Sequence, residues 1–124
     1  MQDEITRLET DKLNKAGGTV TGLILGAQGA DIASAGTTNL ATATGNRLKV
    51  TGTTTITALG TVTAGTEITI TFTGALILTH NATSLILPTA ANITTVAGDS
   101  GIFISLGSGN WKCAVYQRAD GTAV

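Results

Sequence analysis

The sequence contains few charged residues, few aromatic residues, one proline and one cysteine. Charged residues occupy 12% and aromatic residues 3% of the 124 positions, and the net charge is −1. The lone Cys113 excludes an intrachain disulfide, and the balanced charge offers no clustered positive surface for nucleic acid or an anionic membrane. No apolar run approaches the length of a transmembrane helix. We therefore expect no disulfide scaffold, no nucleic-acid partner and no membrane insertion.

Groups that carry chemistry are also scarce. One His, one Cys and eight scattered acidic residues are too few to predict a catalytic triad or a zinc site within one subunit. We expect His80 to be a partly buried imidazole bonded to a neighbouring Thr or Asn; the alternative is an ion held by three copies on a threefold axis. Cys113 alternates with Trp111 and Val115, which predicts a buried, inert thiol. The expected protein is not an enzyme and has no catalytic residue, metal ligand or cofactor.

A fragment of a carbohydrate-active enzyme is the hypothesis from a different class. Glycosidases need a pair of carboxylates, and the shortage of acidic residues argues against it.

Three small residue types dominate what is present. The chain has 25 Thr, 17 Ala and 16 Gly, which together fill 58 of the 124 positions. Abundant Thr beside a single Pro favours strands joined by Gly turns. A surface with so few charges would be poorly soluble as a free monomer unless much of it were covered. The composition therefore predicts self-association.

Charge is concentrated at the N-terminus, where residues 1–15 hold seven of the fifteen charged residues. Residues 1–16 form the first predicted segment, a short helix that ends at the Gly17-Gly18 pair. Two apolar layers are too few for an autonomous coiled coil. We expect the helix to pack beside its symmetry mates, and the alternative is a solvated helix docked on its own domain. The expected contacts in the trimer are made by its apolar residues, Ile5, Leu8 and Leu13.

After Gly18 the apolar period changes from helical to alternating. Residues 17–46 are interpreted as a linker or shaft segment that contains one predicted strand at 19–25. Residues 47–124 are interpreted as a β-rich fibre module. Because no helix follows residue 15 to serve as a crossover, we expect no parallel sheet. The strands predicted in the module are 47–51, 53–59, 67–73, 75–80, 84–87, 92–96, 101–106 and 110–118.

Alternation within these strands predicts the core. The clearest pattern lies at residues 67–73, where Ile68, Ile70 and Phe72 share one face and polar residues share the other. Lys112 is expected to stay in water, as is Arg118. The predicted core residues are Ile68, Ile70, Phe72, Leu76, Leu78, Ile102, Ile104, Trp111, Cys113 and Val115. The expected fold is mainly β: a short N-terminal helix followed by a β-sandwich or β-prism-like module, intertwined or packed as a homotrimer.

Thr-x-Thr triplets recur at residues 53–55, 61–63 and 69–73. Ice-binding solenoids use such rows of hydroxyls, but they need a fixed coil length, and these triplets are irregularly spaced. We therefore interpret them as the solvated faces of strands, where Thr is common.

Two stretches resemble known proteins. Residues 14–25, NKAGGTVTGLIL, resemble the NKAGGTMTGxLxL element of bacteriophage tail-fibre proteins, where it links a helical or coiled stem to a β-rich shaft module. Residues 31–124 are similar to a module that recurs near the C-terminus of many phage tail-fibre and other virion fibre proteins. The second resemblance is carried by DIASAGTTNLATATGN, GTTTITALGTVTAGT, TFTGALILTHNATSLILP and ANITTVAGDSGIFISLGSGNWKCAVYQRADG.

The resemblance implies a homotrimeric, non-enzymatic virion protein, assembled in the host cytoplasm. As a tail fibre it would attach to the host through a surface glycan or protein, although no residue can be assigned to receptor binding. Long tail fibres carry a large N-terminal baseplate-binding part, and we do not expect one within these 124 residues. We therefore expect residues 1–30 to dock on other virion proteins of the baseplate, tail or capsid. The alternative function is a capsid decoration (cement) protein or a head or neck fibre protein.

Overall fold

The computed structural model describes residues 17–124. The predicted N-terminal helix, with Ile5, Leu8 and Leu13, lies outside the described residues. The described part is mainly β, which confirms the predicted class. Its elements are β1 (Ile32–Ala33), the 3-10 helix η1 (Leu40–Thr42), β2 (Arg47–Thr51), β3 (Glu67–Phe72), β4 (Ile77–Leu78), β5 (Leu85–Ile86), the 3-10 helix η2 (Pro88–Ala90), β6 (Ile93–Thr94), β7 (Ser100–Gly107) and β8 (Asn110–Gln117).

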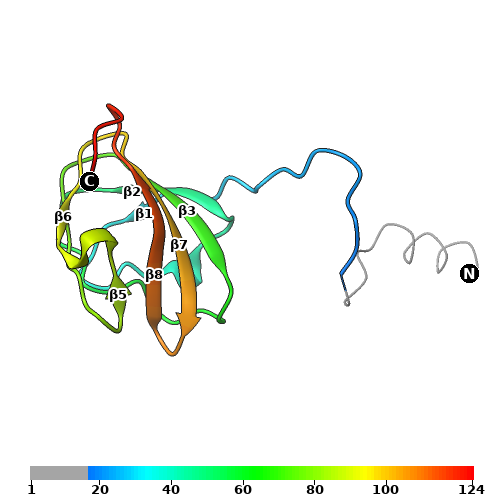
Figure 1. Cartoon of the computed structure of the whole chain (residues 1–124), viewed down its shortest axis with the longest axis horizontal. Coiled ribbons are helices and arrows are strands. Elements are labelled where there is room, and N and C mark those ends of the chain that lie inside the picture. The colour runs from blue at the N-terminus through cyan, green and yellow to red at the C-terminus, as the bar shows by residue number, and fades with distance from the viewer. Residues whose placement is uncertain (1–16) are drawn as a thin grey trace, which may run out of the picture.

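Two sheets enclose the core. The larger sheet has six strands in the order β1-β2-β3-β7-β8-β5 and curls into a half-barrel, whereas β4 pairs with β6 in a smaller sheet. Figure 1 shows β6 on the opposite side of the fold from β3 and β7. The apolar side chains therefore meet between the curled sheet and the segments that face it. No helix in residues 17–124 has the length and apolar character needed to cross a membrane.

Three of the strand pairs are parallel, so the expectation of no parallel sheet was wrong. β1 pairs with β2, β2 with β3, and β5 with β8, all in parallel. A parallel connection needs a dozen or more residues but not a helix. Here the chain between β2 and β3 returns through irregular segments, which make isolated bridges at Thr37–Ala58 and Ile56–Leu78. The chain thus coils upon itself without any crossover helix.

Successive coils are stacked in register. Val50 aligns with Phe72, and Ile56 with Leu78, so that both pairs are 22 positions apart. All four of these side chains are at most 1% exposed. A Cβ on Gly74 would lie 3.1 Å from the carbonyl oxygen of Gly52, so neighbouring coils approach closely at these glycines. Thr-Gly pairs recur with the same spacing, at 51–52 and 73–74, but the irregular Thr-x-Thr spacing conceals the repeat.

A bulge in the β7–β8 hairpin changes which side chains face the core. Phe103 pairs with Cys113 and Ile102 with Val115, which leaves Ala114 unpaired. One extra residue reverses the alternation beyond it. Tyr116 therefore turns inward, and Val115 is 51% exposed. The prediction that Val115 belongs to the core was wrong.

On β7 the inward positions belong to Gly101, Phe103 and Ser105. Ile102 and Ile104 are half-buried on the outer face, so their assignment to the core was also wrong. Because residues 102–104 are all apolar, alternation alone does not show which of them face inward. The packing of Phe103 determines the inward face. A Cβ on Gly101 would lie 2.8 Å from the Phe103 ring, so the ring occupies space that only glycine leaves free.

The other predicted core residues are buried. Ile68, Ile70, Phe72, Leu76, Leu78, Trp111 and Cys113 are each at most 5% exposed. The indole N–H of Trp111 donates a hydrogen bond to the Gly60 carbonyl oxygen at 2.8 Å, which satisfies the polar atom of an otherwise apolar side chain. The core also contains Leu40, Leu48, Val50, Ile56, Leu59, Leu85, Leu87, Ile93, Phe103 and Tyr116.

Most of the segment interpreted as a linker is part of the module. β1 belongs to the six-stranded sheet, and η1 buries Leu40 against the core. The N–H of Arg47 donates to the Ala27 carbonyl oxygen at 3.0 Å, which attaches the chain to the sheet from this point onward. Residues 17–25, which we call the arm, extend away from the module (Figure 1).

Candidate functional site

His80 lies after β4 and is half-buried, as expected. Its imidazole Nδ1 accepts a hydrogen bond from the Leu87 N–H at 3.1 Å, rather than bonding to a Thr or Asn side chain. Its own backbone N–H donates to the Asn92 Oδ1 at 2.8 Å. These bonds connect three segments of the chain, which gives the side chain a structural role. Within residues 17–124 no three His, Cys, Asp or Glu side chains are grouped as metal ligands would be, and an ion shared by three copies stays a prediction.

Cys113 is 5% exposed and donates its S–H to the Val115 carbonyl oxygen at 3.2 Å. Burial raises the pKa of the thiol to about 11. A nucleophilic cysteine needs the thiolate near neutral pH, and this environment disfavours it. Cys113 is thus a core residue, in agreement with the prediction from its position on β8.

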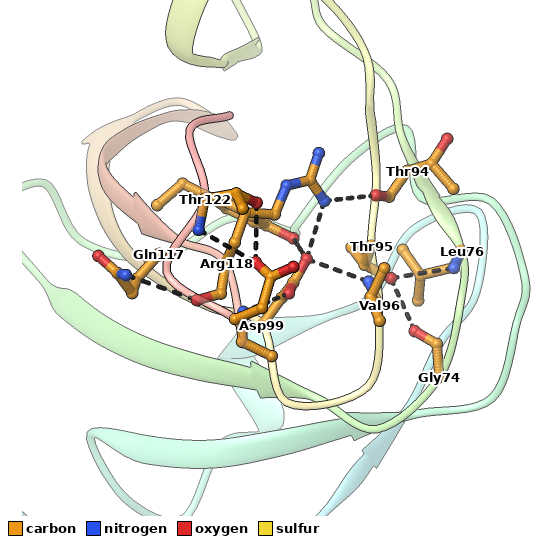
Figure 2. Close-up of polar contacts among 12 residues, drawn as sticks. Gly74, Leu76, Thr94, Thr95, Val96, Asp99, Gln117, Arg118 and Thr122 are labelled. Carbon is orange, nitrogen blue, oxygen red and sulfur yellow. Dashed lines mark hydrogen bonds and ion pairs between the residues drawn. The ribbon is translucent and has the colours of Figure 1, made fainter.

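The densest polar network surrounds Asp99, which ends the turn before β7 and is 1% exposed (Figure 2). Its Oδ2 accepts hydrogen bonds from the Tyr116 hydroxyl at 2.8 Å, the Arg118 guanidinium at 2.9 Å and the Val96 N–H at 3.0 Å. Its Oδ1 accepts from the Ala119 N–H at 2.8 Å. We call these five residues the Asp99 cluster. The cluster attaches the chain after β8 to the turn between β6 and β7.

Opposing influences set the charge state of the cluster. Burial acts to raise the pKa of the Asp99 carboxyl, but the hydrogen bonds it accepts, that from the Ala119 N–H foremost, lower the pKa below its ordinary value of 3.8. Burial, followed by the hydrogen bond to Asp99, raises the pKa of the Tyr116 hydroxyl. At neutral pH the carboxylate is therefore charged and the phenol is a neutral donor.

Arg118 completes the network. Its guanidinium donates to the Thr94 carbonyl oxygen at 2.7 Å and lies 5.6 Å from the centroid of the Tyr116 ring. The side chain is only 21% exposed, so the expectation that Arg118 stays in water was wrong, whereas Lys112 is exposed as expected. No sequence signal pointed to this cluster, because Asp99 and Arg118 are isolated charges 19 positions apart.

Beside the cluster lies an open cavity of about 180 Å³. Asp99 and Arg118 contribute to its wall, together with the exposed Asp120 and Thr122. Both carboxylate oxygens of Asp99 already accept bonds from the protein itself. The geometry therefore assigns the cluster to holding the fold together.

The arm presents the three most exposed large apolar side chains of the described residues, and a fourth that is half exposed. Leu23 is 86% exposed, Leu25 80%, Ile24 74% and Val20 51%. The strand predicted at residues 19–25 is not formed, because the segment bends at Gly22 and has no partner strand among the described residues. Exposed apolar side chains gathered in one place mark an interaction site. The arm is therefore the candidate functional site that the structure adds to the predictions.

A second, smaller apolar surface lies on the outer face of the β7–β8 hairpin. Val115 is 51% exposed and Leu106 48%, with the half-buried Ile102 and Ile104 on the same hairpin. Lys112 pairs with Ile104 across the strands and introduces a charge among these side chains. This surface therefore combines apolar and charged side chains, whereas the arm contains no charged residue.

Comparisons of this chain with protein-family models, with curated proteins and with solved structures find no match. The function must therefore be inferred from the residues and their geometry.

Proposed function

We propose that the chain is a structural protein of a bacteriophage virion, a homotrimeric tail fibre that takes part in host attachment. Residues 14–25 and 31–124 resemble phage fibre elements. The observation that carries the proposal is the position of the arm. The NKAGG element links a stem to a β-rich module in such fibres, and in this chain the corresponding residues lead into the arm that precedes the β module.

The physical properties of the chain are consistent with this role. The module is held by a continuous apolar core and by the Asp99 cluster, and every buried side-chain nitrogen or oxygen in residues 17–124 has a hydrogen-bond partner. Such a domain suits a rigid external part of a particle. The exposed apolar arm and the low overall charge support assembly with other chains. In this proposal residues 1–30 also carry the attachment to other virion proteins.

Localisation on the virion tests the proposal. Purified phage particles are labelled with gold-conjugated antibody against the β module and imaged by electron microscopy, with particles from a deletion mutant as the control. We expect label at the tail, and adsorption of the deletion mutant to host cells should fall. Label on the capsid or neck would favour the decoration or neck-fibre function instead. Absence of the protein from purified particles would refute a virion function altogether.

A further inference from the structure

The arm has the composition of a strand but pairs with no strand in residues 17–124. Residues 16–30 contain no charged residue, and residues 19–25 have the composition of a strand. Among the described residues no hydrogen bond involves the arm, and nothing lies within 4 Å of a Cβ placed on Gly17 or Gly22. The arm therefore leaves both backbone polar groups and apolar side chains in water.

We propose that the arm is an intersubunit strand that packs against the same segment of other copies of this chain. Leu23, Ile24 and Leu25 are consecutive, and each is at least 74% exposed. Consecutive side chains of a non-helical segment point in different directions, so an acceptor surface on one side would cover only some of them. Identical arms grouped about a common axis surround one another, and because they carry no charge they approach without repulsion.

The direction of the arm favours this arrangement over docking on a neighbouring module. The arm leads away from its own module (Figure 1), so copies related by an axis along the arm bring their arms together. The arm also follows directly on the predicted helix, whose Ile5 and Leu8 we expect to contact symmetry mates. This inference rests on the homotrimer of the proposed function, and it specifies which residues form the interface.

Cysteine cross-linking tests the contact between identical positions. We compare Leu23→Cys in the arm with Thr55→Cys, an exposed position on the module, under mild oxidation. Cys113 stays in place because it is buried, and the wild-type chain serves as its control. We expect a covalent dimer band for Leu23→Cys and none for Thr55→Cys. Equal cross-linking of the two variants, or none at Leu23, would overturn the proposal.

Charge substitution tests the energetic role of the arm. The variant Leu23→Asp/Leu25→Asp places two charges in the arm, and Leu106→Asp/Val115→Asp places two on the outer face of the hairpin. In sedimentation experiments we expect the arm variant to weaken association about 100-fold or more and the hairpin variant to associate like the wild type. Trp111 fluorescence should show a folded module in the arm variant, because the arm makes no hydrogen bond to the module.

The outcomes separate this inference from the proposed function. An arm variant that still associates overturns the inference, and leaves the virion function standing if the protein is found on particles. If only the hairpin variant dissociates, the interface lies on the outer face of β7 and β8, and the inference about the arm is overturned. A wild-type chain that is monomeric when pure overturns the inference and removes the homotrimer from the proposed function.

Discussion

Asp99→Asn is the substitution that tests the Asp99 cluster most sharply. The asparagine side chain has almost the same shape but carries no charge, and its NH2 group can only donate. Asp99 is 1% exposed, and four donors face its carboxylate. In the variant the amide nitrogen must face either the Ala119 N–H or the three donors on the other side, so at least one donor loses its acceptor.

The expected loss of stability follows from these contacts. A hydrogen bond to a charged group contributes about 1.5–3 kcal/mol, and breaking a buried ion pair costs about 3–5 kcal/mol. Arg118 is 21% exposed and can turn toward water, which lowers the cost of breaking its ion pair with Asp99. We therefore expect the free energy of unfolding to fall by about 2–4 kcal/mol. Denaturant unfolding followed by fluorescence of the buried Trp111 measures this change.

The pH dependence provides a second signature. Because the pKa of Asp99 is lowered in the folded protein, its contribution to stability is present above its ordinary value of 3.8 and is lost as the pH falls through the lower folded value. Wild type should therefore lose stability in this acid range, and Asp99→Asn should lose less. Asp120→Asn is the matched control, because Asp120 is exposed and removal of its charge should leave the free energy of unfolding almost unchanged. Equal stability of the Asp99 and Asp120 variants would refute the structural role of the cluster.

Three further predictions concern the core and the N-terminus. Trp111→Ala should cost about 3–5 kcal/mol as a core truncation, and a wild-type emission maximum typical of a water-exposed indole would contradict the burial of Trp111. Cys113, whose pKa is raised to about 11, should react with a thiol reagent at pH 8 about 100-fold more slowly in the folded than in the denatured chain, because little thiolate is present; similar rates in both states would contradict its burial. Deletion of residues 1–15 should leave a folded β trimer with a modestly lower melting temperature that no longer enters virions; failure of this truncated chain to form trimers would make the helix the assembly nucleus.

The fold could be predicted where alternation is unambiguous. β3 alternates Ile and Phe with Glu and Thr, and its inward residues are buried as predicted. Alternation failed where register depends on distant partners. The bulge at Ala114 turns Val115 outward and Tyr116 toward the core, and nothing in the local sequence indicates a bulge. On β7 all of residues 102–104 are apolar, so only the fit of Phe103 against Gly101 decides which face is inward.

The coiled N-terminal half was missed for a related reason. The absence of a crossover helix predicted no parallel sheet, but irregular chain connects the parallel strands β2 and β3 instead. The repeat of 22 positions spans two coils only, and β1 pairs with β2 at a spacing of 18, so the period is not constant. Stacking of Val50 on Phe72 is a tertiary outcome that a pattern this short cannot specify.

The candidate site was predicted only in part. The sequence of residues 19–25 indicates a strand, but only the structure shows that they pair with no strand in the part of the chain it describes. The Asp99 cluster was not anticipated, because its charged members are solitary in the sequence and are joined by contacts between 17 and 19 positions apart. Burial of a single acid depends on the turn that carries it, and composition contains no information on that turn.

The mass in solution of the wild-type chain of 124 residues tests the central claim most directly. Sedimentation equilibrium at micromolar concentration needs no virion and no variant. A homotrimer joined through its arms has a mass three times that of the 12.4 kDa chain. We expect this mass as the main species, with Trp111 buried. A folded monomer of 12.4 kDa under these conditions would contradict the trimeric fibre and the intersubunit role of the arm together.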